Sequence, residues 1–219
     1  MFYKPNLATV VLLVSVLLGL SASCALFRPV SPAPRTYGNV FEANDAYPCA
    51  MVTFSAAPTY LDFERSNSDG EERLAYILKT TAKPQYSYTL TKVHNASGND
   101  EWAMVPVAEQ FDSSEKLYER TEGNEYATRS AVIYTQTRKD GVYLEGLIGE
   151  YIGTDDALFF TISRAIIRKS DATTVSEWRT SRTGVNMLAD MTRQMDWFFS
   201  RLAVTGCVDD INVRKTILK

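Results

Sequence analysis

The chain has 219 residues, with 23 basic and 26 acidic side chains and a formal net charge of −3. This balance argues against nucleic acid as a partner, because binding to phosphates requires a concentrated basic face. Apolar residues make up 45% of the chain, including 12 tyrosines and 10 phenylalanines, which is enough to build a core. A folded part of about 180 residues is expected to form one domain.

The first predicted element is an export signal. Residues 7–20 are almost entirely apolar and follow a short start with one charged side chain, Lys4. This stretch is shorter than the roughly 20 residues that span a membrane, so it predicts a signal peptide at residues 1–23. The small residues that follow it also allow cleavage by an ordinary signal peptidase after Ser23 or Ala25, and an uncleaved anchor is a further alternative.

The segment Leu20-Ser21-Ala22-Ser23-Cys24 resembles the lipobox of bacterial lipoproteins, in which small residues precede a cysteine that is acylated and becomes the mature N-terminus. The resemblance covers only the leader, and the leucine stands four places before the cysteine rather than three. It implies lipidation of Cys24. Because Ala25 rather than aspartate follows the cysteine, the sorting rule of this family implies the outer membrane, with the domain facing the periplasm or the cell surface.

The three cysteines, Cys24, Cys49 and Cys207, leave one thiol unpaired in an exported chain. Lipidation of Cys24 removes this oddity, and Cys49 and Cys207 are then expected to form a disulfide in an oxidising compartment. The alternative is two buried free thiols. No metal site is expected, because two distant cysteines and the lone His94 lack the clustered spacing of zinc ligands.

The mature chain begins with a proline-rich segment, residues 24–36, which indicates a lipid-anchored tether. Residues 37–219 are expected to form a single β-rich domain. Alternating apolar and polar side chains, separated by turn-forming sequences, predict seven strands, at residues 49–57, 73–81, 86–94, 102–109, 129–137, 142–152 and 157–168. Less regular segments are expected to form a turn or short helix (58–63), a loop (66–70) and an exposed excursion (111–125).

Two turns set the expected register of the last three strands. A type I′ turn at Asp140-Gly141 and a turn at residues 153–156 place Gln136 opposite Glu145, and Glu145 opposite Arg164. The resulting polar row is either an anchoring point for the polar head of a ligand or a cross-strand ion pair near the rim of the sheet.

Glu150 is expected on a face that otherwise carries apolar side chains, with Ala131 and Phe159 as neighbours. Burial without a partner would raise the pKa of this carboxyl group, and such groups are enriched at functional sites. The alternative is a solvated position at an open end of the sheet. Gln136, Glu145, Glu150 and Arg164 are therefore the candidate ligand-binding residues.

A capping box at Thr174 and Glu177 predicts the start of a helix that runs to about Ala203. Its apolar stripe is expected to pack on the sheet, or else to meet a partner or a membrane. The predicted fold class is α+β, an antiparallel, strongly curved sheet or barrel of about seven strands with one long C-terminal amphipathic helix packed on it.

The sequence contains none of the motifs of serine hydrolases, zinc proteases, phosphate-binding loops or dinucleotide-binding folds. No catalytic residue and no cofactor are therefore predicted. The preferred hypothesis is a non-catalytic structural or assembly component of the cell envelope that contacts the membrane through its anchor and other proteins through its surface. A carrier or receptor for an apolar or lipid ligand held between sheet and helix is the alternative, and a hydrolase with two carboxylates is the third class.

Overall fold

A computed structural model describes residues 34–44, 48–68, 70–81, 86–95, 107–123, 128–152 and 156–205. The signal peptide, Cys24, Cys207 and most of the predicted tether lie outside these residues. The described chain is α+β and mainly β-sheet, as the sequence predicts. Its elements are β1 (Arg35–Tyr37), β2 (Val40–Ala43), β3 (Cys49–Thr53), β4 (Pro58–Ser68), β5 (Glu71–Thr80), β6 (Ser87–Asn95), the 3-10 helix η2 (Val107–Gln110), β7 (Tyr118–Gly123), β8 (Thr128–Arg138), β9 (Gly141–Ile152), β10 (Asp156–Arg168), α2 (Val175–Thr180), α3 (Arg182–Phe199) and β11 (Leu202–Thr205).

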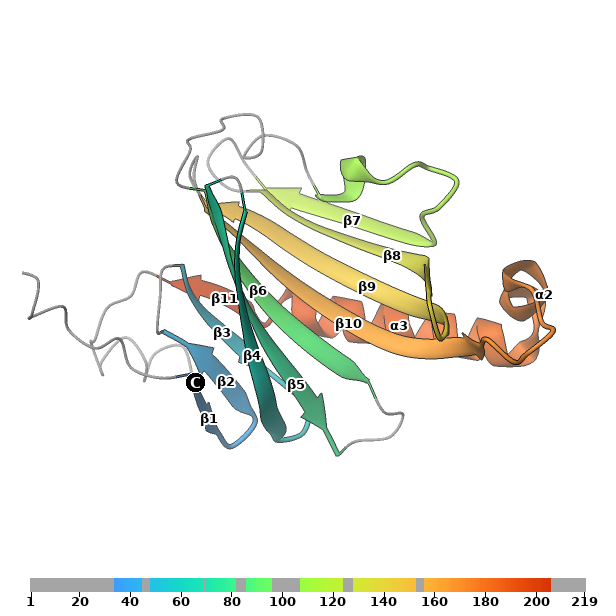
Figure 1. The fold of residues 1–219 in the computed structure, drawn as a ribbon, viewed down its shortest axis with the longest axis horizontal. Helices are drawn as coiled ribbons and strands as arrows, with labels where there is room; N and C mark the ends of the chain where they lie inside the picture. The colour runs from blue at the N-terminus through green and yellow to red at the C-terminus, as the bar shows by residue number, and fades with distance from the viewer. Residues whose placement is uncertain are drawn as a thin grey trace, which may run out of the picture. The chain divides into compact units, whose positions relative to one another are not determined.

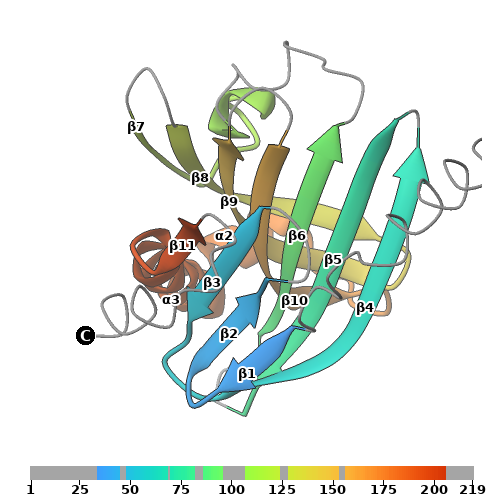
Figure 2. The same cartoon turned by 90° about the vertical axis from the view of Figure 1, so that its left-hand side faces the viewer.

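The larger of two antiparallel sheets has seven strands in the order β4-β5-β6-β10-β9-β8-β7 (Figure 1). β4 and β7 are its edges and do not pair with each other, so the sheet is open. Of the two predicted forms, a curved sheet or a barrel, the barrel is therefore wrong. Figure 2 shows that the sheet curves, so that β4 and β5 do not lie in one plane with β8 and β9.

The smaller sheet has four strands in the order β1-β2-β3-β11. Only β3 among these strands was predicted. β11 pairs with β3 across about 150 residues of sequence, with Thr205 opposite Cys49, and β1 starts at Arg35, within the segment assigned to the tether. Short strands joined by a distant pairing give little periodic signal, which explains why the sequence did not indicate a second sheet.

The main core lies on one face of the large sheet, which we call the inner face. Apolar side chains of β5, β6, β8, β9 and β10 pack there against α3 and against one side of the small sheet. Phe198 of α3 lies at the meeting point, with ring centroids 5.2 Å from Phe54, 5.5 Å from Tyr88 and 4.8 Å from Phe160. All four rings are buried.

A second cluster covers part of the opposite, outer face of the large sheet. Its buried members are Val93, Val132, Tyr151 and Ala157. η2 contacts β7, β8 and β9 on this side, and the nearby Phe111 ring lies 4.6 Å from that of Tyr134. The sequence predicts a strand at 102–109 and an exposed excursion at 111–125. In the described part of this segment the structure instead has the helix η2 and the edge strand β7.

The capping box at Thr174 and Glu177 is confirmed. The single long helix to about Ala203 is wrong, because Ser181 adopts an extended conformation and separates α2 from α3. The Ser181 hydroxyl accepts a hydrogen bond from the backbone N–H of Gly184, 3.0 Å away, and so caps α3. Ala203 belongs to β11. None of the described helices combines the length and the apolar character that crossing a membrane requires.

Gly146 allows α3 to approach the inner face closely. A Cβ atom at this position would lie 2.2 Å from Sδ of Met195 and 3.3 Å from Sδ of Met191. Both methionines are fully buried. Because Gly146 on β9 has no side chain, α3 can lie close to the sheet. The C-terminal end of α3 therefore lies next to the charged ends of β7, β8 and β9.

Candidate functional site

The register of β8, β9 and β10 decides which of the predicted site residues meet. Arg138 pairs with Gly141, so the turn consists of Lys139 and Asp140 rather than Asp140 and Gly141. Gly141 is needed in the strand, because a Cβ atom there would lie 2.2 Å from the carbonyl oxygen of Ile167 on β10. The predicted register is therefore shifted by two residues between β8 and β9.

Glu145 faces Tyr134 on β8 and Ser163 on β10, both on the outer face. The predicted pairings of Glu145 with Gln136 and with Arg164 across the strands are wrong. Gln136 pairs with Tyr143 but still reaches Glu145, because residues on one face are two positions apart. With its amide nitrogen turned toward Glu145, Gln136 donates a hydrogen bond to Oε2 at 2.6 Å.

Glu145 is only 2% exposed and is surrounded by donors. The Tyr134 hydroxyl donates to Oε2 at 2.9 Å, and the Ser163 hydroxyl donates to Oε1 at 3.1 Å. Arg138 forms an ion pair with Oε1. Burial, followed by the charge of Glu145 and the hydrogen bond to it, raises the pKa of Tyr134 above its ordinary range. These contacts make Glu145 a satisfied structural carboxylate.

Arg164 lies on the inner face, away from Glu145. Its guanidinium carbon is 5.5 Å from the centre of the Tyr86 ring. The Tyr86 hydroxyl in turn donates a hydrogen bond to Oδ2 of Asp190 on α3, 2.5 Å away. Arg164 therefore belongs to the packing between the sheet and α3.

Glu150 is on the inner face, as predicted, but its neighbours are Arg129 and Leu158 rather than Ala131 and Phe159. Nε of Arg129 donates to Oε2 of Glu150 at 2.8 Å. Nη1 of Arg129 donates to the carbonyl oxygen of Phe199, the last residue of α3, at 2.7 Å. Arg129 therefore connects β9 to the C-terminal end of α3, where a helix favours positive charge.

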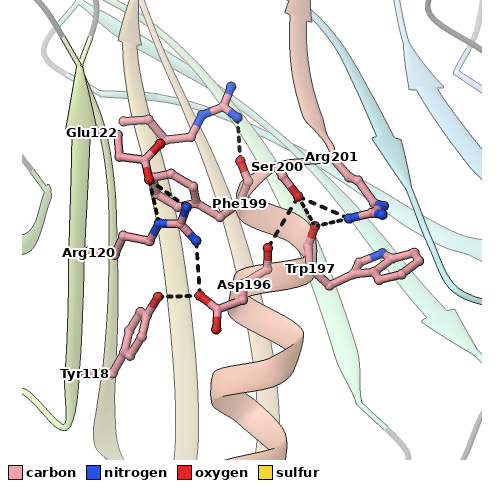
Figure 3. Close-up of polar contacts among 9 residues, drawn as sticks. Tyr118, Arg120, Glu122, Asp196, Trp197, Phe199, Ser200 and Arg201 are labelled. Carbon is pink, nitrogen blue, oxygen red and sulfur yellow. Dashed lines mark hydrogen bonds and ion pairs between the residues drawn. The ribbon is translucent and has the colours of Figure 1, made fainter.

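A second arginine approaches the same end of α3 from β7. Arg120 donates two hydrogen bonds to Oε1 of Glu122, and its Nη1 lies 3.1 Å from Oδ1 of Asp196 (Figure 3). Its guanidinium carbon lies 4.2 Å from the centre of the Phe199 ring. Oδ1 of Asp196 also accepts a hydrogen bond from Tyr118 at 2.8 Å. Acidic and basic side chains therefore alternate around this end of α3 and hold it by hydrogen bonds and ion pairs.

These groups line a pocket of about 370 Å³ at the junction of β7, β8, β9 and the C-terminus of α3. Two arginines and two glutamates dominate its wall, which consists of Arg120, Glu122, Gly123, Arg129, Glu150, Phe199 and Ser200. Such a wall suits a polar or charged group of a ligand or a partner. We take this pocket, called here the α3 pocket, as the candidate functional site.

The sequence analysis found only Glu150 among these residues. Arg120 and Glu122 lie two positions apart, which is the spacing of residues on one face of a strand. This spacing could have predicted the strand β7 from the sequence. Arg129 was placed correctly on a strand, but the shifted register concealed its pairing with Glu150. Phe199 was treated as an interior residue of a longer helix.

The titration of Tyr118 offers a test of this geometry. Burial, with a smaller effect of the hydrogen bond to Asp196, raises the pKa of Tyr118 from 10.0 to about 12. The folded state therefore retains the phenol proton longer than the unfolded chain, and this contribution to stability is complete below pH 10 and lost as the pH rises toward 12. In a spectrophotometric titration of the folded protein, Tyr118→Phe should remove one ionisation near pH 12.

Asp196→Asn is the matched variant, because it keeps Tyr118 and removes the acceptor charge. We expect the same ionisation to move to lower pH in this variant. If the ionisation that Tyr118→Phe removes lay near pH 10 rather than near pH 12, this result would contradict the contact.

Cys49 is buried and disulfide-bonded. Because Cys24 and Cys207 lie outside the described residues, the pairing with Cys207 and the lipidation of Cys24 stay predictions.

In the part of the chain that the structure describes, no three His, Cys, Asp or Glu side chains are grouped so that they would hold a metal ion. His94 forms a pair with Asp156, with Nδ1 and Oδ1 2.6 Å apart.

No known protein family matches this chain, and neither a curated protein nor a solved structure is significantly similar to it.

Proposed function

We propose that this protein is an exported, lipid-anchored component of the cell envelope that acts without catalysis, as a structural or assembly component in contact with other proteins. The apolar leader and the lipobox-like segment that ends at Cys24 support the anchor and an outer-membrane location. Both features belong to the sequence outside the described residues.

The packing of the inner face carries the argument for an assembly role. A carrier of an apolar ligand needs an apolar cavity of roughly 300–1,000 Å³. The centre of this fold is instead filled by aromatic rings that meet at 4.8–6.1 Å, among them Phe54, Phe160 and Phe198. The α3 pocket has charged walls. The described interior therefore supports a protein that acts through its surface.

The surface also offers a region for contacts. β4 is an edge strand of 11 residues whose side chains are exposed from Thr59 onward. Tyr60, Leu61 and Phe63 on this strand are 37%, 48% and 38% exposed. Large apolar side chains on a sheet edge are typical of sites that contact another protein.

The anchor is tested by fractionation of cells that express the full chain. We expect the wild type in the membrane fraction, with an acylated N-terminal Cys24 in its mass spectrum, and the Cys24→Ser variant in the soluble fraction of the envelope. A wild-type protein that is soluble or that retains residues 1–23 would contradict the anchor.

The assembly role is distinguished from a carrier by what the purified protein contains. We expect organic extraction of the denatured Cys24→Ser variant to release no apolar compound in a stoichiometric amount. This variant is the right material because acyl chains on Cys24 cannot be mistaken for a ligand. An equimolar lipid in the extract would overturn the assembly role in favour of a carrier.

A further inference from the structure

Positive charge is concentrated at one end of the large sheet, at the β8–β9 turn, the end of β10 and α2 (Figure 1). Residues 138–140 and 168–182 carry six basic and three acidic side chains there, a net charge of +3. Because the whole chain has a net charge of −3, all its other residues together carry −6. We call these two segments the basic end.

The turn and the end of β10 form one surface. Arg138 on β8 and Arg168 on β10 both lie opposite Gly141 of β9, so they occupy one row on the outer face. Two strand spacings separate their Cα atoms by about 10 Å. The backbone N–H of Lys169 donates a hydrogen bond to the carbonyl oxygen of Asp140 in the turn, 3.0 Å away.

The two helices add further cations at this end. α2 contacts β10, and its Trp178 is buried in the main core. The start of α3 packs on α2, since a Cβ atom on Gly184 would lie 3.3 Å from the Cα atom of Arg179. Arg179 and Arg182 are therefore neighbours on adjoining helices, and both are exposed.

The carboxylates of the basic end are already used within the chain. Asp140 accepts a hydrogen bond from a tyrosine hydroxyl, Asp171 accepts one from a backbone N–H, and Glu177 completes the capping box. Five exposed cations have no carboxylate partner among the described residues, namely Lys139, Arg168, Lys169, Arg179 and Arg182. External carboxylates can therefore bind here without breaking an internal ion pair.

The distribution of charge favours a short acidic segment as the partner. The broad negative surface of a membrane or of a nucleic acid would repel the −6 carried by the rest of the chain. Helices that lie on membranes also present several large apolar side chains, whereas Val185 is the one exposed residue of this kind on the described helices. Arginine, moreover, matches the planar geometry of a carboxylate with two parallel hydrogen bonds.

The basic end also lies away from the proposed anchor. The segment that carries Cys24 enters the domain at β1, in the small sheet. Figures 1 and 2 show the small sheet and α2 on opposite sides of the compact unit Ala33–Lys219. This arrangement suits contact with a partner protein better than contact with the membrane that holds the anchor.

We propose that the basic end binds an acidic segment of a partner protein, whose carboxylates pair with Arg168, Arg179 and Arg182. The proposal rests on the assembly role and names the chemistry of the partner.

Fluorescence anisotropy of a labelled peptide in which glutamate and serine alternate tests the proposal. The protein is the soluble Cys24→Ser variant at low ionic strength, where contacts between exposed charges are least screened. We expect this peptide to bind, and the same peptide with glutamine in place of glutamate not to bind.

A triple variant locates the binding surface. Arg168→Gln with Arg179→Gln and Arg182→Gln should weaken binding about tenfold, because each contact between exposed charges contributes little and three are removed. These side chains have no partner among the described residues, so the fold should be unaffected.

The matched control is Arg65→Gln with Arg73→Gln and Arg193→Gln. It removes the same charge from arginines that are 62%, 48% and 70% exposed elsewhere on the molecule, and it should weaken binding less than about twofold.

Three results would overturn the proposal. The first is that the glutamate peptide does not bind, and the second is that the two triple variants weaken its binding equally. The third is that the basic end is required for binding to vesicles of anionic lipid but not to the peptide, which would assign it to a membrane. Because the Cys24→Ser protein has no lipid anchor, this test and the fractionation test of the anchor fail independently.

Discussion

Phe198→Ala is expected to lower the free energy of unfolding by about 3–5 kcal/mol, the usual cost of removing a buried aromatic ring from a core. Phe198 is 1% exposed and contacts rings from β3–β4, β6 and β10 at once. The substitution therefore opens a cavity at the point where the large sheet, the small sheet and α3 meet. Chemical denaturation followed by tryptophan fluorescence measures the change.

Val185→Ala on the same helix is the matched control. Val185 is 56% exposed, so its truncation should change the free energy of unfolding by no more than about 0.5 kcal/mol. A loss below about 1 kcal/mol for Phe198→Ala would mean that α3 does not pack against the inner face as described, and the argument against an apolar cavity would fail with it.

Local signals in the sequence were sufficient for the central strands. β8, β9 and β10 carry clear alternation and short turns between them, and the helix start at Thr174 depends on two side chains three positions apart. The edge strands gave no such signal. β4 is exposed on both faces, so its side chains need not alternate. Residues 58–63, predicted as a turn or short helix, and residues 66–68, predicted as part of a loop, belong to this strand, whereas Gly70 lies in a turn as predicted.

The candidate site required information that a single sequence does not contain. A one-residue error in the register between β9 and β10 moves Arg164 to the opposite face, and a two-residue error between β8 and β9 hides the pairing of Arg129 with Glu150. The position of Gly141 was the decisive detail. Its role is to admit the carbonyl oxygen of Ile167, a contact with a strand 26 residues further along the chain.

Substitution of Glu145 is expected to have the second large effect. Glu145→Leu leaves the hydroxyls of Tyr134 and Ser163 without their acceptor in a buried setting, and it removes the partner of Arg138. Breaking such a buried network costs several kcal/mol, but Arg138 is 42% exposed and can turn to water. We therefore expect a loss of about 2–3 kcal/mol in the free energy of unfolding. Glu64→Leu, at an exposed position of β4, is the control and should change it by at most about 0.5 kcal/mol.

Glu145→Gln separates the charge of Glu145 from its shape. Burial, and after it the negative charge of Glu145 and the hydrogen bond to it, keeps the pKa of Tyr134 above the ordinary value of 10.0, so the folded state holds this proton longer than the unfolded chain. That contribution to stability is complete below pH 10 and is lost as the pH rises above it. In Glu145→Gln the pKa of Tyr134 should fall, and the loss of stability above pH 10 should become shallower. The contradicting result is that Tyr134→Phe abolishes this alkaline dependence while Glu145→Gln leaves it unchanged. Burial alone would then account for the raised pKa of Tyr134. Glu145 would stabilise the outer face through its hydrogen bonds, without a contribution from its charge.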